Sequence, residues 1–121
     1  MSHVVTIQTK VRDAAAIAAA CRRLGLAEPV QGKAQMYAGQ TAEGLLVQLP
    51  GWKYPIAIDT QNGDVKHDNF GGYWGETRRL ENFLQAYAVE LAKQEARRKG
   101  CAVTETQLQD GSIKVQIQEG T

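Results

Sequence analysis

The chain has 121 residues, a length typical of one domain, and we expect residues 1–121 to form a single domain. Hydrophobic residues make up 43% and charged residues 22%, which is typical of globular proteins and argues against disorder. The 14 Lys and Arg residues against 13 Asp and Glu residues give a formal net charge of +1, which disfavours nonspecific nucleic-acid binding. No apolar run approaches the roughly 20 residues that a membrane helix needs.

The beginning of the sequence predicts a strand followed by a helix. Residues 3–11 alternate and are rich in β-branched types, which predicts a half-buried strand. The residues expected on one face of that strand are Val5, Ile7, Thr9 and Val11. Asp13 is then a suitable N-cap for a helix over residues 14–24, and Gly25 is a suitable residue to end it. The apolar stripe of this helix contains Ile17, Ala20, Cys21 and Leu24.

The middle of the chain predicts strands. Residues 34–38 form a short strand, residues 44–49 form a clearer one, and Pro50 breaks it. Residues 54–60 and 64–70 then predict a hairpin, because Asn-Gly at positions 62 and 63 is the strongest short hairpin signal. A two-residue turn there pairs Ile58 with His67 and Asp59 with Lys66, and the second pair predicts a cross-strand ion pair. The residues expected on the apolar face are Ile56, Ile58, Val65 and His67.

The last third predicts a long helix and a second hairpin. The helix has Thr77 as its expected N-cap and runs to about Lys99. Its apolar stripe contains Leu80, Phe83, Leu84, Tyr87, Ala88 and Leu91. Residues 102–108 and 112–118 form the hairpin around Asp110 and Gly111, with an apolar face that we expect to be buried: Ile113, Val115 and Ile117. The element order predicts an α+β fold, with two helices packed on one face of a largely antiparallel sheet.

The two cysteines, Cys21 and Cys101, lie far apart and form no Cys-x-x-Cys pair. We expect both to be small buried hydrophobic residues in a reducing compartment, rather than a disulfide or redox pair. The first residues show no charged region followed by an apolar stretch, so no secretory signal is predicted. The expected location is the cytoplasm.

Two segments rich in glycine and large rings are the most unusual part of the sequence. They are residues 49–55 (Leu-Pro-Gly-Trp-Lys-Tyr-Pro) and residues 69–75 (Asn-Phe-Gly-Gly-Tyr-Trp-Gly), and the second leads into a helix N-terminus. They predict a binding surface, or alternatively a loop whose rings cap the open end of the core. The candidate binding residues are Trp52, Tyr54, His67, Asn69, Gly71, Gly72, Tyr73, Trp74, Arg78 and Arg79.

Catalysis has little support in the sequence. His67 is expected on an apolar face, which favours a structural histidine over a general base. We therefore predict no catalytic residue, no metal ligand and no cofactor. The sequence favours a protein that is not an enzyme. The alternative is a small-molecule or nucleotide-binding protein, in which the glycine-rich loop and the helix N-terminus hold an anionic group near His67.

A set of short motifs resembles a bacterial family of unknown function with plastid relatives, described as domain of unknown function 1257 and as a hypothetical chloroplast reading frame. The motifs are residues 2–7, 11–13, 49–52, 68–72 and 83–88. The resemblance covers essentially the whole chain and implies a small intracellular protein with no established catalytic residues. It also implies an accessory or adaptor role beside an AAA-type ATPase. The expected function is a non-enzymatic binding module for a protein partner or for itself as a homo-oligomer.

Overall fold

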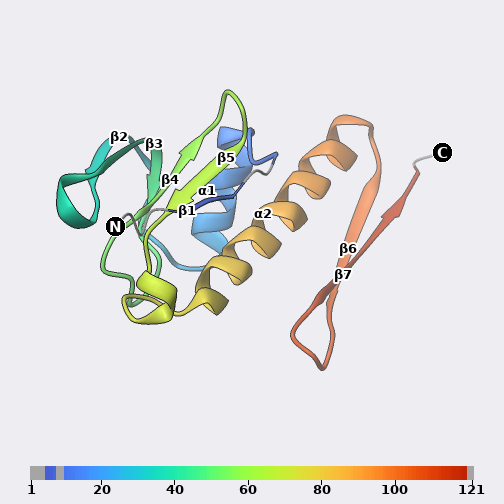
Figure 1. The fold of residues 1–121 in the computed structure, drawn as a ribbon. Helices are drawn as coiled ribbons and strands as arrows, with labels where there is room; N and C mark the ends of the chain where they lie inside the picture. The colour runs from blue at the N-terminus through green and yellow to red at the C-terminus, as the bar shows by residue number, and fades with distance from the viewer. Residues whose placement is uncertain (1–4, 8–9, 120–121) are drawn as a thin grey trace.

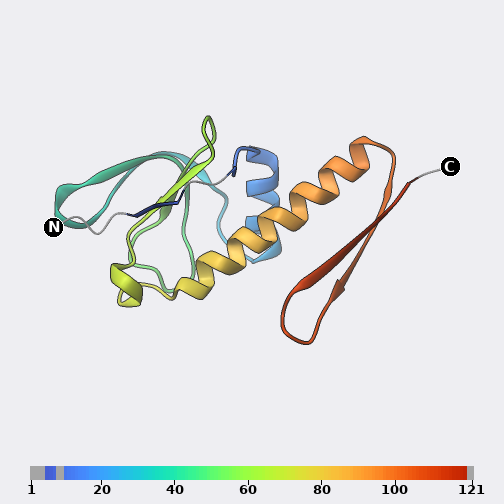
Figure 2. The ribbon, with the colours of Figure 1, turned by 45° about the vertical axis from the view of Figure 1, so that its right-hand side comes forward.

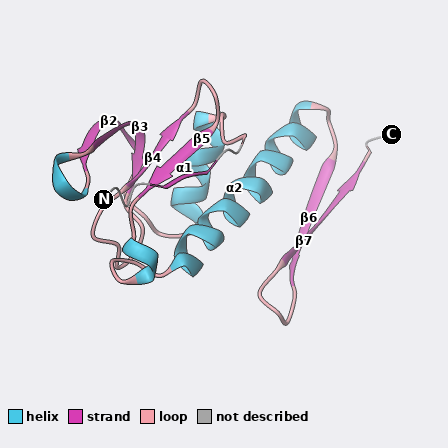
Figure 3. Ribbon diagram, viewed as in Figure 1, coloured by secondary structure: helices cyan, strands magenta, loops and turns pink. Residues whose placement is uncertain are grey.

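The computed structural model describes residues 5–7 and 10–119 (Figure 1). Figure 3 colours the helices, strands and loops of the chain. In chain order the elements are β1 (Val5–Ile7), α1 (Ala14–Arg23), β2 (Val30–Gln35), the 3-10 turn η1 (Tyr37–Gly39), β3 (Thr41–Val47), β4 (Ile56–Asp59), β5 (Asp64–His67), the 3-10 turn η2 (Phe70–Gly72), α2 (Thr77–Arg98), β6 (Ala102–Gln107) and β7 (Ile113–Gln118).

The predicted α+β fold is confirmed. Five antiparallel strands form one sheet in the order β1-β5-β4-β3-β2, and β6 and β7 form a separate two-stranded sheet. Residues of both helices and of one face of the larger sheet form a single apolar cluster, which we call the main core. Its largest fully buried side chains include Phe83, Ile17, Leu49, Ile56 and Ile58. The helices therefore cover one face, as predicted.

The first predicted strand, residues 3–11, is described in part. β1 pairs with β5 so that Val5 lies opposite His67, whereas His3 and Thr9 lie outside the described residues. Val11 is buried in the main core, and its N–H donates to the carbonyl of Gly63. The start of α1 follows the prediction, because the Asp13 carboxylate accepts a hydrogen bond from the Ala16 N–H at 2.9 Å.

The predicted register of the central hairpin is wrong by two residues. Asp59 lies opposite Asp64, Ile58 opposite Val65 and Ala57 opposite Lys66, so the predicted Asp59–Lys66 pair does not form across the strands. The turn has four residues instead of two, because the Asp59 carboxylate accepts the Gln61 N–H and the Asp59 carbonyl accepts the Gly63 N–H. A shift of two residues preserves the faces, so Ile56, Ile58, Val65 and His67 are still buried.

Strand limits in the middle of the chain also differ from the prediction. β2 begins at Val30 and ends before Met36, and β3 begins at Thr41. The second face of the sheet carries a small apolar cluster of Met36, Ala42 and Ala57. The partly buried side chains of Leu46 and Tyr54 pack against this cluster.

Helix α2 buries Leu80, Phe83 and Tyr87 of the predicted stripe, and Leu84 and Leu91 pack against the main core while partly buried. Ala88 is exposed, whereas Ala86 is buried, so the prediction for position 88 is wrong. The end of α1 lies beside the flank of α2 that carries Ala86, because Arg23, Leu24 and Ala86 line one groove. The buried stripe of α2 therefore includes Ala86, on the side where α1 and α2 meet.

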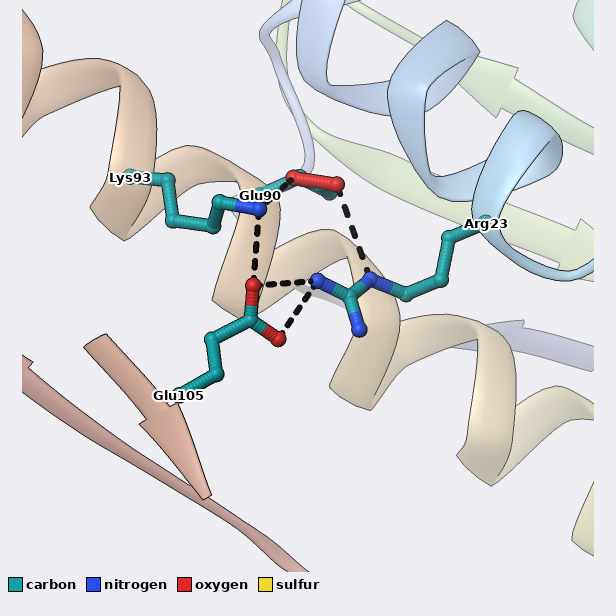
Figure 4. A network of polar contacts seen from close by, with 4 residues as sticks. All are labelled: Arg23, Glu90, Lys93 and Glu105. Atoms are coloured by element: carbon teal, nitrogen blue, oxygen red, sulfur yellow. Dashed lines mark hydrogen bonds and ion pairs between the residues drawn. The ribbon is translucent and has the colours of Figure 1, made fainter. Parts of the chain in front are cut away.

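The C-terminal hairpin lies on the opposite side of α2 from the larger sheet (Figures 1 and 2). Four charged side chains, Arg23, Glu90, Lys93 and Glu105, join α1, α2 and β6 (Figure 4). The shortest contacts run from Lys93 and Arg23 to Glu105, each at 2.7 Å. The face of this hairpin that was predicted to be buried is only partly so, because Ile113 and Val115 are half-buried and Ile117 is 50% exposed.

Candidate functional site

The two glycine-rich segments meet in space at the end of the molecule where α2 begins. The Lys53 N–H donates to the Trp74 carbonyl at 2.8 Å, and the Trp52 indole N–H donates to the Glu76 carbonyl at 3.0 Å. The Asn69 carbonyl accepts the Trp74 N–H at 2.9 Å, which closes the η2 loop on itself. Segments that are twenty residues apart in sequence, 49–55 and 69–75, therefore form one structural unit.

Trp74 is the centre of an aromatic cluster on this unit. Its ring stacks on Phe70 at 4.7 Å between centroids, meets Tyr37 at 5.2 Å, and meets Tyr54 edge-on at 5.8 Å. Tyr73 packs beside Phe70 at 5.4 Å. We call these five residues the aromatic surface: Tyr37, Tyr54, Phe70, Tyr73 and Trp74. Tyr73 is 84% exposed, and Tyr37 and Phe70 are about 40% exposed, so much of this ring area faces solvent.

The backbone that carries these rings adopts unfavourable conformations. Ala38 in η1 has a φ of 59°, and Phe70 in η2 has a φ of 47°, a left-handed region that costs non-glycine residues about 1 kcal/mol or more. Gly71 and Gly72 also have positive φ, which explains glycine at both positions. Both loops thus hold exposed rings at a cost in backbone energy, a combination that often marks functional sites.

Trp52 is not part of the exposed surface that the sequence led us to expect. It is 5% exposed and belongs to the main core, where its ring packs edge-on against His67 at 5.6 Å. Gly75 lies directly against the indole, because a Cβ at position 75 would be 2.5 Å from the ring. The sequence cannot separate Trp52 from Trp74, since both tryptophans lie between glycines and tyrosines.

Two other candidate residues, His67 and Asn69, are buried. Burial lowers the pKa of His67, and the neighbouring Asp68 charge opposes that effect. The Asn69 side chain donates to the Gly75 carbonyl and to the Thr77 hydroxyl, and so fixes the loop that leads into α2. Neither side chain is on the surface: Asn69 holds the loop in place, and His67 packs against Trp52 in the core.

The N-terminus of α2 differs from the predicted anion site. Glu76, not Thr77, is the N-cap residue, and its side chain makes no capping hydrogen bond. Arg78 is exposed and pairs with Glu76 at 3.7 Å, while Arg79 is half-buried. The carboxylate of Glu76 already supplies the negative charge that a helix N-terminus attracts, so this end of α2 is poorly suited to a further anion.

Sequence reasoning missed four residues that the structure brings to this region: Tyr37, Lys53, Asp68 and Phe70. Tyr37 has a recognisable signal, because Tyr-Ala-Gly repeats the pattern of a ring followed by a positive-φ turn seen at Phe70. Lys53 lies over the Trp74 and Tyr54 rings at 4.6 and 5.4 Å. Asp68 is fully buried and accepts the Tyr37 N–H.

The remaining chemistry is sparse. Cys21 is buried as predicted, Cys101 is only partly so, and burial raises the pKa of the Cys21 thiol. Within residues 5–7 and 10–119, no three His, Cys, Asp or Glu side chains lie close enough together to hold a metal ion. No helix of the described part of the chain is long and apolar enough to cross a membrane.

Comparison of the chain with protein-family models, with curated proteins and with solved structures finds no match. The resemblance to the domain-of-unknown-function family therefore stays a prediction from the sequence motifs.

Proposed function

We propose that this chain is a non-enzymatic binding protein of the cytoplasm that uses the aromatic surface to hold a protein partner. The observation that carries the proposal is the exposure of Tyr73, Tyr37 and Phe70 on two loops with positive φ. Rings at a solvent boundary are the residue type that dominates protein interfaces, and their fixed positions reduce the entropy lost on binding. The family resemblance adds an AAA-type ATPase as the partner class to test.

The competing proposal of a nucleotide or anion site near His67 has less support. His67 packs against Trp52 in the core, and Glu76 lies at the N-terminus of α2. Nucleic acid is also the weaker choice, because the net charge is only +1.

Capture from the native cell with immobilised protein tests the proposal, using Tyr73→Ala as the variant. Tyr73 is almost fully exposed, so its truncation leaves the fold intact and removes only contact area. Leu108→Ala is the matched control, because Leu108 is a 44% exposed apolar residue that precedes the turn between β6 and β7.

We expect one protein to bind the wild type and Leu108→Ala and to be reduced at least tenfold with Tyr73→Ala, as for a hot-spot residue. The captured protein is then purified and titrated against all three forms. Equal capture by Tyr73→Ala and the wild type would overturn the proposal. Light scattering over a range of concentrations identifies the case in which the partner is a second copy of the chain.

A further inference from the structure

The Tyr54 and Trp74 rings stand at 80° to each other and form two walls around a cation. That cation is the ammonium of the chain's own Lys53, which lies 4.6 Å from the Trp74 ring and 5.4 Å from the Tyr54 ring. The hydrogen bond from the Lys53 backbone N–H to the Trp74 carbonyl places the Lys53 backbone beside these rings. Perpendicular ring faces around an ammonium are the arrangement by which proteins recognise alkylammonium ligands.

A buried carboxylate adds negative charge to the same region. Asp68 is 0% exposed, and its Oδ2 accepts the Tyr37 N–H at 3.3 Å, while the Tyr37 ring contacts Trp74. Its Oδ1 is buried and has no hydrogen-bond partner among the described residues. A buried carboxylate oxygen without a donor is costly, and a positive charge placed nearby reduces that cost.

Lys53 is held only weakly in this site. Its side chain is exposed and forms no ion pair with any residue in the described ranges 5–7 and 10–119. An exposed cation–π contact contributes only about 0.5–1 kcal/mol. A second cation with a better fit to the rings can therefore replace the Lys53 ammonium without breaking any stronger contact.

We propose that Tyr54 and Trp74 form a recognition site for an alkylammonium group, such as a lysine or methylated lysine side chain of a protein partner, and that Lys53 occupies this site in the free protein. The inference rests on the proposed function, because it names the chemical group by which the aromatic surface holds its partner. Lys53 acts as an internal competitor, and Asp68 supplies the negative charge that favours a cationic ligand over a neutral one.

The proposal is tested by titrating the full chain with the amide of Nε-trimethyl-lysine and following the indole N–H signals by NMR. Trp52 is buried and serves as an internal reference, so the shift is expected at Trp74 alone. The uncharged analogue with a tert-butyl group in place of trimethylammonium is the ligand control. Sodium chloride at equal concentration controls for ionic strength.

Lys53→Gln vacates the site, so we expect it to tighten binding of the probe roughly two- to fivefold, the factor that corresponds to an exposed cation–π contact. Asp68→Asn keeps an oxygen for the Tyr37 N–H but removes the charge, and we expect it to weaken binding at least threefold. Lys66→Gln, which removes an exposed lysine from β5, is expected to leave the affinity unchanged. Circular dichroism checks the fold of each variant.

Weaker or unchanged binding with Lys53→Gln would overturn the proposal, and so would equal binding of the neutral analogue. An anion site would respond in the opposite direction, because removal of Lys53 would then lower the affinity. A failure of the cation site can be distinguished from a failure of the proposed function. If Tyr73→Ala loses the protein partner while the probe fails to bind, the aromatic surface still binds a protein and only the cation site is wrong.

Discussion

The two hairpins of this chain are held in different ways. The β4–β5 hairpin lies inside the five-stranded sheet, and its isoleucines are fully buried against the helices. The β6–β7 hairpin pairs with no other strand of the described chain, and a groove of about 990 Å³ separates part of it from α1 and α2. The Arg23, Glu90, Lys93 and Glu105 network joins it to α1 and α2, and its Ile113 and Val115 side chains are half-buried. Fully buried apolar side chains thus fix the sheet, whereas charge pairs and half-buried side chains together hold the C-terminal hairpin.

Matched isoleucines give the largest expected difference. Ile58 in β4 is 0% exposed and Ile117 in β7 is 50% exposed. Ile58→Ala removes buried methyl groups and leaves a cavity, so we expect a loss of about 2–5 kcal/mol in the free energy of unfolding. Ile117→Ala is expected to cost less than about 1 kcal/mol. Urea denaturation measures both, and similar losses would show that the hairpin is packed as firmly as the sheet.

Removing a charge from the network tests the attachment of the C-terminal hairpin directly. Glu105→Gln breaks the ion pairs with Arg23 and Lys93, and since the side chains are partly exposed we expect a loss of about 1 kcal/mol or less. The loss is local, so amide hydrogen exchange is expected to speed up in β6 and β7 and not in β4 and β5.

Glu95→Gln is the control for that change, because Glu95 pairs with Arg98 at the exposed end of α2 without touching the hairpin. Hydrogen exchange in β6 and β7 is expected to be unaffected in this variant. Faster exchange in β4 and β5 with Glu105→Gln would contradict the separation of the two regions.

Acid is expected to destabilise the two regions in different pH ranges. These are the smallest of the expected effects. The hydrogen bond from Lys93, and after it that from Arg23, lowers the pKa of Glu105, so its contribution is complete above pH 4.5 and is lost as the pH falls through the lowered value. Burial lowers the pKa of His67, so the folded state binds its proton less readily and stability begins to fall below pH 6.5.

Two variants separate these effects. The His67→Gln variant is expected to lose the fall in global stability between pH 6.5 and 5, measured by urea denaturation. In the Glu105→Gln variant, hairpin exchange is already faster and is expected to show no further increase below pH 4.5, after correction for the intrinsic exchange rate. A global transition that both variants change equally would show that the hairpin and the sheet unfold together.

Local chemistry determined much of this fold. The Asp13 cap, the Gly25 helix end and the faces of the alternating strands were predictable, because each depends on residues within one or two turns of chain. The predicted hairpin register was wrong because Asp59 builds a four-residue turn from a sequence that also suits a two-residue one. The apolar and polar faces of the strands survived that error, since the side-chain period of two tolerates a shift of two.

The tertiary structure alone decided which rings are exposed. The sequence marked both glycine-rich segments, and they do meet, but it could not predict that Trp52 is buried against Gly75 while Trp74 is at the centre of the aromatic surface. It also gave no reason to connect Tyr37 and Asp68, which are 31 residues apart and joined by one hydrogen bond. Exposure and contact between distant residues depend on how the sheet and helices pack, and the spacing of residues along the chain does not contain that information.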